Sequence, residues 1–383
     1  MIENLKKHHK AAHKKAPEGV VFVPGRLAFI GEHLEEHGGK ALMGATQEGV
    51  YLAYGEHPER EVRYFDEAID APRKIDPLAG PGVSARLEDC VVDAVMHKIH
   101  KELSDFPKGV QLTMHTNLPN FNAFAGDTAL ALAIIEALCA LFGCDIADEK
   151  RVRIVNAAFR DVLRTPRRDN DLITQMFAKK DHLVYNDALN QTHELLPFKF
   201  EGVVVHAYAP DKIHDEWYER HKQRVRALKN VADAVANFRS ITHLCDVSVK
   251  DFTDIKGRLS GGEVLKHAEH MVFEADRVNN IKTALEIEDL EWFAETLEQS
   301  SQSLSSLYDY VPSDLAFLLD IVATQHTLAT RAANKTPNQL IYIVATETPK
   351  ADDDIAARYE RTHKKKLAVL PFKASDGLKR IKT

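Results

Sequence analysis

The stretch "VPGRLAFIGEHLEEHGGKAL", residues 23–42, is the most informative part of the sequence for the fold. An apolar β-run at 20–23 leads into it, and the Pro-Gly pair at 24–25 predicts a break before the run resumes. A turn carrying Arg26 should lie at this break, and the polar segment "GEHLEEH" at 31–37 follows the second run. This pattern indicates two β-runs with Arg26 in the turn between them.

Outside residues 23–42, the N-terminal part of the chain is rich in strand patterns and the C-terminal part is rich in helix patterns. From Asp127, apolar residues recur at helical spacing until Gly143, which predicts the end of that helix. Further strands are expected at 49–57, 61–65, 109–118, 202–210, 340–346 and 366–372, and further helices at 149–163, 216–238, 262–284, 287–307 and 313–330. Strands and helices in mixed runs favour the α+β class over a doubly wound sheet.

The composition describes an ordinary globular protein. With 383 residues, 44% hydrophobic and 28% charged residues, the chain suits two domains. A net charge of -7 argues against a nucleic-acid surface and favours small-molecule or protein partners. No apolar run predicts a membrane span or a signal peptide, and Cys90, Cys139, Cys144 and Cys245 form no C-x-x-C pair. We therefore expect reduced, mostly buried thiols and a cytoplasmic protein.

The N-terminal run "MIENLKKHHKAAHKK" admits three interpretations. It could bind an anionic partner, or it could bind a metal through His8, His9 and His13. The third interpretation is a solvated, fraying helix end. We favour the third, because nothing downstream extends the basic patch.

Three stretches together resemble the galactokinase family of the GHMP small-molecule kinases. Residues 23–42 resemble A-P-G-R-V-N-x-I-G-E-H-T-D-Y-x-x-G-x-V-L, residues 266–278 resemble R-R-A-x-H-V-x-x-E-x-x-R, and residues 301–315 resemble S-H-x-S-L-x-x-L-Y-x-V-S-x-x-E-L. The resemblance implies a two-domain α+β fold with substrate between the domains. Residues 1–198 would form an N-terminal domain with a left-handed βαβ unit, and residues 199–383 a helix-rich α/β domain. It also implies transfer of the ATP γ-phosphoryl group to galactose.

On the sugar side, the resemblance assigns substrate binding to residues of the signature. Glu32 and His33 match the family's sugar-binding pair, and Glu35 replaces an aspartate with a side chain one methylene longer. A sugar-contacting tyrosine of the family falls on Trp217 or Tyr218, depending on a one-residue shift. The alternative for the acidic residues is a solvated loop.

The family's catalytic aspartate corresponds to Asp171, within "RRDNDL" at 167–172, and its partner arginine corresponds to Arg26. An aspartate beside an arginine stays ionised and can orient or deprotonate the acceptor hydroxyl. Arg168 replaces a glycine that touches the sugar, so its guanidinium would fill the pocket or select an anionic ligand. The alternative is a polar surface turn in which Asp171 caps the following helix.

The groups that bind Mg-ATP in the family are altered in three stretches. The magnesium-binding glutamate corresponds to Phe159, which cannot ligate a hard cation, and the C-terminal glycine loop corresponds to "AANKTPNQ" at 332–339, where Pro337 removes an N–H donor. In the phosphate loop, two glycines become Phe121 and Ala123, and three serines become Ala125, Gly126 and Asp127. We expect Asp127 to cap the helix and block anions. Three independent losses against one ligand predict a lost function.

Three hypotheses follow. The first is a galactokinase-like protein that no longer phosphorylates and acts as a sugar-binding or regulatory homologue, with no cofactor and no metal. The second is an active galactokinase, or related sugar 1-kinase, that uses Mg-ATP and Asp171 as base. The third is a scaffold that binds another protein. The expected ligand is a small-molecule sugar, with no nucleic-acid or membrane partner.

Overall fold

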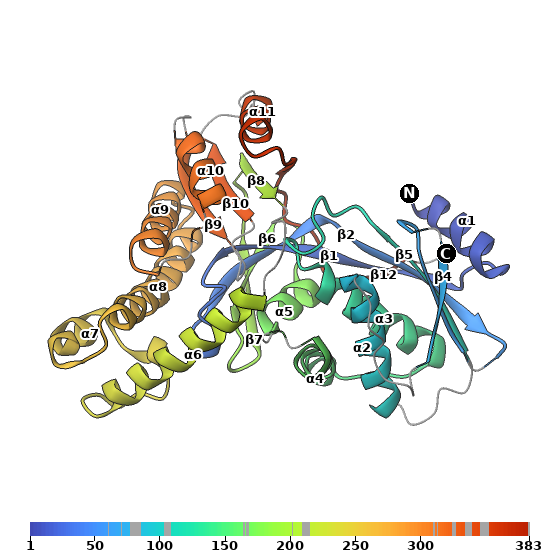
Figure 1. Cartoon of the computed structure of the whole chain (residues 1–383), viewed down its shortest axis with the longest axis horizontal. Helices are drawn as coiled ribbons and strands as arrows, with labels where there is room; N and C mark the ends of the chain where they lie inside the picture. Colours follow the sequence, from blue (N-terminus) through green and yellow to red (C-terminus); the bar gives the residue numbers. More distant parts are fainter. Residues whose placement is uncertain are drawn as a thin grey trace. The chain divides into compact units, whose positions relative to one another are not determined.

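The chain consists of two compact units that interleave along the sequence. Unit 1 comprises Met1–Arg26, Ala45–Ala178 and Asp376–Thr383, and unit 2 comprises Leu27–Gly44 and Lys179–Ser375. The mixture of helices and sheets confirms the α+β class (Figure 1). The predicted domains, 1–198 and 199–383, stay a prediction. The computed structural model describes residues 1–59, 61–69, 71–76, 86–102, 109–163, 165, 168–200, 202–208, 215–308, 311, 313–323, 327–333, 339–344 and 352–381.

Unit 1 is built on a sheet with the strand order β12-β1-β2-β5-β3-β4. Its strands are β1 (Gly19–Ile30), β2 (Ala41–His57), β3 (Val62–Asp66), β4 (Ala71–Ile75), β5 (Gly109–Thr116) and β12 (Lys379–Ile381); β1 and β2 continue into unit 2. β3 and β5 are parallel neighbours, and the chain between them includes helix α2 (Leu87–Glu102). The expected left-handed crossover stays a prediction.

Helices α2, α3 and α4 pack against one another in unit 1 (Figure 1). Helix α3 (Gly126–Phe142) is the helix predicted from Asp127 onward, and Gly143 ends it in the left-handed conformation with φ 62°. Its first fourteen residues are buried, which explains their near-continuous apolar character. Helix α4 (Asp148–Ala158) runs into a π-helical turn (Phe159–Leu163), and α5 (Asp169–Phe177) follows.

The predicted break at Pro24 and Gly25 is wrong, since β1 is one continuous strand. Pro24 lies beyond Val20–Phe22, the residues of β1 that pair with β12. A proline is tolerated where a ladder has ended, because its missing N–H leaves no ladder bond unmade. Arg26, two residues on, donates its backbone N–H to the carbonyl of Phe124.

The fraying N-terminus that we favoured is also wrong. Helix α1 (Ile2–His13) packs on β5 and buries Leu5, His9 and His13. His9 Nδ1 lies 2.9 Å from Thr113 Oγ1, and His13 Nε2 lies 3.2 Å from the same oxygen. Leucine and two histidines at spacing i, i+4, i+8 form the buried face of the helix, a periodicity that our emphasis on charge overlooked.

Unit 2 holds a hairpin and a second sheet. Strands β6 (His182–Asp187) and β7 (Thr192–Pro197) pair, and residues 41–43 of β2 extend the hairpin. The second sheet has the order β11-β8-β10-β9, all antiparallel, with β8 (Val203–Tyr208), β9 (Thr327–Ala333), β10 (Gln339–Val344) and β11 (Leu367–Pro371). Its described helices are α6 (Asp215–Ala236), α7 (Val249–Ile255), α8 (Glu263–Glu286), α9 (Leu290–Ser306), α10 (Ser313–Ala323) and α11 (Asp352–His363).

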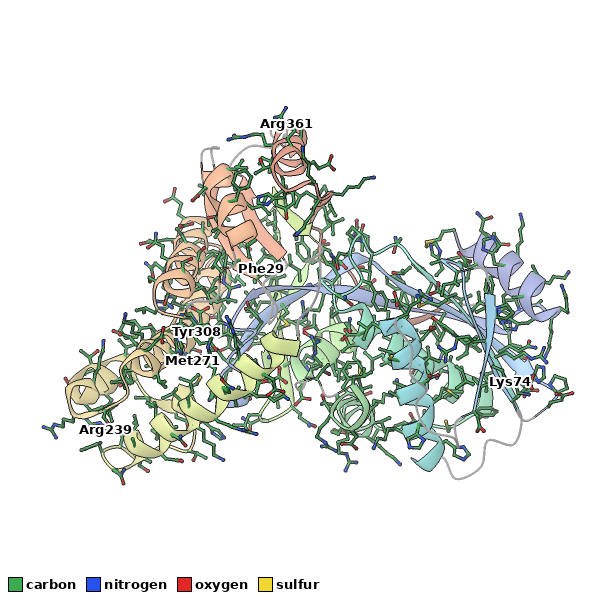
Figure 2. The ribbon with its side chains drawn as sticks, viewed as in Figure 1. Phe29, Lys74, Arg239, Met271, Tyr308 and Arg361 are labelled. Carbon is green, nitrogen blue, oxygen red and sulfur yellow. The ribbon has the colours of Figure 1, made fainter. Side chains whose placement is uncertain are left out.

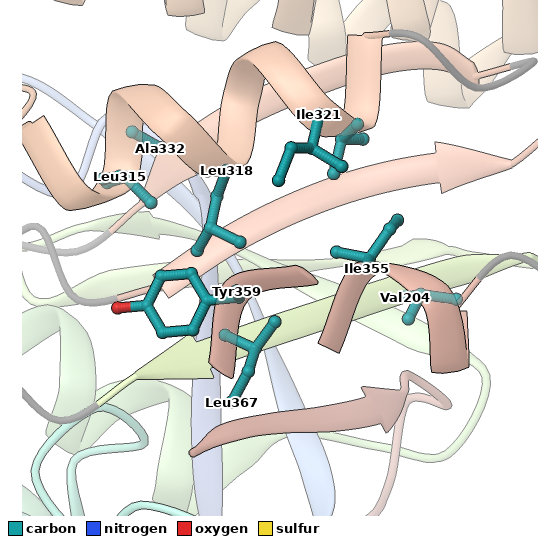
Figure 3. Close-up of a cluster of buried hydrophobic side chains, with 9 residues drawn as sticks. Val204, Leu315, Leu318, Ile321, Ala332, Ile355, Tyr359 and Leu367 are labelled. Carbon is teal, nitrogen blue, oxygen red and sulfur yellow. The ribbon is translucent and has the colours of Figure 1, made fainter. Parts of the chain in front are cut away.

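Two apolar clusters stabilise unit 2. In the first, α10 and α11 pack against the second sheet, with Leu318 and Tyr359 at the centre (Figure 3). In the second, the ring of Phe29, labelled in Figure 2, contacts those of Phe198 and Phe372. The helix predicted over 313–330 ends at Ala323, because the residues from Thr327 pair with β10 instead.

The four cysteines form no disulfide; Cys139 is buried and the other three are half-buried. Among the described helices, none combines the length and the apolar character needed to span a bilayer.

Candidate functional site

The predicted aspartate and arginine meet in unit 1. Asp171 is the third residue of α5, and Arg26 lies in β1. Arg26 Nε donates to Asp171 Oδ1 at 2.5 Å, and the two side chains are 1% and 3% exposed. The alternative of a surface turn capped by Asp171 is therefore wrong, because Asp171 is buried inside the first turn of α5. A buried, charge-assisted bond of this kind fixes the position of the carboxylate.

Arg168 binds the other oxygen of the same carboxylate. Its Nη1 lies 3.3 Å from Asp171 Oδ2, and its Nη2 lies 3.5 Å from Asp127 Oδ2. Its backbone N–H donates to Asn156 Oδ1 at 3.0 Å, where the family's glycine backbone would touch the sugar. Each oxygen of Asp171 thus faces a guanidinium, and Arg168 joins the first turns of α5 and α3.

The loop before α3 is closed by its own side chains. Ala123 and Phe124 are fully buried, and Phe121 packs on Gly126, where an added Cβ would lie 2.4 Å from the ring. The N–H of Gly126 donates to the carbonyl of Phe121 at 2.7 Å, and that of Ala125 donates to the carbonyl of Asn122. Phosphate binding at a helix N-terminus requires free N–H groups and close backbone approach. These two N–H groups point back into the loop instead.

The prediction that Asp127 caps α3 is wrong in position. The helix begins at Gly126, and the residue before it is Ala125, in the left-handed conformation with φ 54°. Asp127 lies inside the first turn, where its Oδ1 accepts the N–H of Thr128 at 2.9 Å. The first helical hydrogen bond, from the N–H of Ala129 to the carbonyl of Ala125, starts the helix two residues earlier than the cap pattern indicated. Asp127 nevertheless places a carboxylate at the positive end of the helix dipole.

Sequence reasoning missed a hydrogen-bonded connection between the start of α3 and helix α5. The carbonyl of Ala125 accepts hydrogen bonds from Gln175 Nε2 and from Thr128 Oγ1, both at 2.9 Å. Gln175 follows Asp171 by four residues, so both lie on one face of α5. That spacing was the available signal. The carbonyl of Ala125 is held, and so is the turn that precedes α3.

The position of the family's magnesium-binding glutamate is apolar. Phe159 is fully buried and begins the π-helical turn. Asp161, two residues on, is bound to Lys98 and Arg160, which lower the pKa of its carboxyl to about 2. Magnesium requires oxygen ligands in near-octahedral geometry. Phe159 and Asp161 therefore do not fit the magnesium that the family implies at this position.

Glu32 lies in a buried ion-pair network of unit 2. Arg331 of β9 binds both its oxygens, with Nη1 3.2 Å from Oε1 and Nη2 3.0 Å from Oε2. The same guanidinium contacts Glu274 Oε1 at 3.3 Å and Ser300 Oγ at 2.8 Å. Burial would raise the pKa of Glu32, but the charge of Arg331, its hydrogen bonds and the other neighbouring groups together outweigh burial, so the pKa is lowered. Glu32 is ionised and links the signature to α8, α9 and β9.

His33 extends this network through a pair of imidazoles. Its Nε2 lies 2.7 Å from His270 Nε2, and His270 Nδ1 lies 2.8 Å from Ser303 Oγ. Burial lowers the pKa of both histidines, so one neutral ring donates to the other. The ring of Tyr308, labelled in Figure 2, lies 4.7 Å from that of His270, and burial raises its pKa to about 12.

His33, His270 and Glu274 lie close enough to hold a metal ion. However, Glu274 already accepts from Ser300, Arg277 and Arg331. The short contact between the two imidazole nitrogens leaves no room for an ion between them. The group is better described as a hydrogen-bonded polar core.

Of the remaining predicted site residues, the structure describes some and leaves others outside the described part of the chain. Glu35 is buried in a 3-10 turn (Glu35–His37) of unit 2. Trp217 and Tyr218 belong to α6, but their side chains lie outside the described residues, as do residues 334–338 of the C-terminal loop, Pro337 included. The sugar-binding roles of Glu32, His33, Glu35, Trp217 and Tyr218 stay predictions.

Comparison with solved structures agrees with this fold. Galactokinase of Lactococcus lactis complexed with galactose aligns with 99% of this chain and 100% of its own, at 17% identity and a TM-score of 0.90. A mevalonate kinase aligns with 93% and 99%, at 12% identity and a TM-score of 0.59. The chain has the fold of the GHMP small-molecule kinases.

Sequence comparison then narrows the class. Residues 6–56 match the galactokinase galactose-binding signature. Galactokinase of Clostridium perfringens is 23% identical over 315 residues, 80% of each chain. Galactokinase of Thermotoga maritima is 25% identical over 306 residues, 78% of this chain and 81% of that one. The chain therefore carries the galactose-binding signature and resembles galactokinases over about four fifths of its length, as the sequence resemblance predicted.

Proposed function

We propose that this chain binds a galactose-like sugar and does not transfer phosphoryl groups from Mg-ATP. One observation carries the proposal: the carboxylate of Asp127 occupies the first turn of α3 and is held there by Arg168. This turn is where the family's phosphate loop would present N–H groups to ATP. A fixed anion at that point repels a polyphosphate.

Other features of unit 1 support the loss of transfer. Phosphoryl transfer depends on positioning the phosphates and on metal ions that neutralise the developing charge. Phe159 supplies no oxygen, and the loop from Phe121 to Phe124 is packed with apolar side chains. Both oxygens of Asp171 are bound by guanidinium groups, so neither is left without a partner to accept the hydroxyl of a sugar.

Sugar binding is supported by the match of residues 6–56 to a galactose-binding signature and by the likeness to a galactokinase that holds galactose. The test is a thermal-shift panel of galactose, other hexoses and acidic sugars with wild-type protein. We expect galactose to raise the unfolding temperature saturably. The control is Asp148→Asn on the exposed start of α4, which should respond as wild type does. No shift with any sugar would contradict sugar binding.

The comparisons favour a second candidate, an active galactokinase. The named relatives are galactokinases across about four fifths of the chain, and the Arg26–Asp171 pair is present. If this candidate is correct, ATP and galactose give galactose 1-phosphate, and Asp171→Asn abolishes the product. Turnover that persists in Asp171→Asn would contradict the assigned base, and turnover by wild type would overturn the first proposal.

A further inference from the structure

We infer that Arg168 is a specificity-determining residue of unit 1: its guanidinium takes the place of a divalent metal ion and excludes one. The inference deepens the proposed function, because it names what closes the site to metal. It starts from the mismatch described above, since Phe159 stands where the family places a ligand oxygen.

The geometry around Arg168 is that of a shared cation. One terminal nitrogen lies 3.3 Å from Asp171 Oδ2 and the other lies 3.5 Å from Asp127 Oδ2. The three side chains are 12% exposed or less. Two carboxylates that converge on one buried group need a positive charge between them, and a guanidinium supplies it at every accessible pH.

Arg168 is held in this position by its neighbours. It precedes α5, and its backbone N–H donates to Asn156 Oδ1 of α4. Asn156 also donates to Asp169, the first residue of α5. A bound metal would have to displace a tethered cation and overcome its repulsion.

The inference predicts that removal of the charge opens a metal site. We propose titrating Mn²⁺ alone, followed by electron paramagnetic resonance, into wild type, Arg168→Gln and Arg168→Lys. Wild type and Arg168→Lys should show no saturable binding, because both keep the positive charge. Arg168→Gln should bind Mn²⁺ saturably, in the roughly millimolar range of weak oxygen-liganded sites. Adding Asp127→Asn to Arg168→Gln should abolish that binding.

Two outcomes would overturn the inference: saturable Mn²⁺ binding by wild type that is lost in Asp127→Asn, or folded Arg168→Gln that binds no Mn²⁺. If Arg168→Gln does not fold, the double variant Arg168→Gln with Asp127→Asn tests whether charge is the cause. Removing one of the two carboxylates should then restore folding. Failure to restore it would show that Arg168 acts through packing and not through charge. Galactose phosphorylation by wild type would overturn the proposed function, whereas this titration contains neither nucleotide nor sugar and judges the inference separately.

Discussion

Residues of the galactokinase-like signature form buried hydrogen bonds with other side chains of unit 2. Glu32 and His33, predicted to bind sugar, lie in a buried network with Arg331 and His270. The residue match to the family predicted a sugar-binding role for both but could not reveal these partners, because Arg331 lies 299 positions from Glu32 in the sequence. Long-range pairing of buried charges depends on the tertiary fold.

Replacement of Arg331 by methionine should destabilise unit 2 strongly. The change would leave Glu32 and Glu274 buried without their shared cation, at a cost of about 3–5 kcal/mol. Urea unfolding of wild type and Arg331→Met measures the difference. Lys199→Met, which breaks an exposed ion pair with Glu288, is the control and should change stability by less than about 1 kcal/mol. Equal effects of the two variants would contradict the network's role.

Gly126 should tolerate no side chain. Its Cβ would lie 2.4 Å from the ring of Phe121, so Gly126→Ala must move that ring or the start of α3. We expect a loss of about 1–3 kcal/mol in unfolding free energy, which Phe121→Ala in the same chain should reduce in a double-mutant cycle. Gly257→Ala, with no atom near the added Cβ, is the control. Additive effects of the Gly126 and Phe121 changes would contradict the contact.

Among the secondary-structure elements, α3 was predicted closely and α1 was not. The apolar spacing after Asp127 and the glycine at 143 suffice to define α3. In α1 the histidines were judged by their charge, yet their packing on β5 makes them part of the buried face. The cap of α3 was placed two residues late, because the first helical hydrogen bond, from Ala129 to Ala125, has no sequence signature.

Helix α1 should loosen in mild acid. Burial lowers the pKa of His9 to about 3 and that of His13 to about 4, below the ordinary value of 6.5. Below pH 6.5 the unfolded chain therefore binds protons that the folded chain does not, so stability is lost as the pH falls from 6.5 toward 4. At pH 5 each histidine should cost about 1–2 kcal/mol.

Hydrogen exchange of the α1 amides at pH 7 and pH 5, corrected for the intrinsic rate, measures this loss. His9→Gln with His13→Gln should flatten the pH dependence, because glutamine does not titrate. Lys7→Gln, an exposed neighbour on the same helix, should keep it. A pH dependence unchanged in the double variant would contradict the assignment.

For the whole molecule, the α+β class and family membership were predicted from three short stretches spread along the chain. The galactose-binding signature and the fold of a galactokinase agree with that prediction. The sequence also indicated that Phe121, Ala123 and Asp127 replace residues of the phosphate loop and that Phe159 replaces the metal-binding glutamate. It could not show that Arg168 joins Asp127 to Asp171, since that contact requires α3 and α5 to meet.

The most direct test of the account is titration calorimetry of Mg-ATP into wild-type protein saturated with galactose, with product analysis of the same mixture. We predict no saturable heat up to about 5 mM nucleotide, above the usual range of enzyme substrate affinities, and no galactose 1-phosphate. Saturable, magnesium-dependent binding of ATP, with or without product, would contradict the proposal that this chain has lost its nucleotide site.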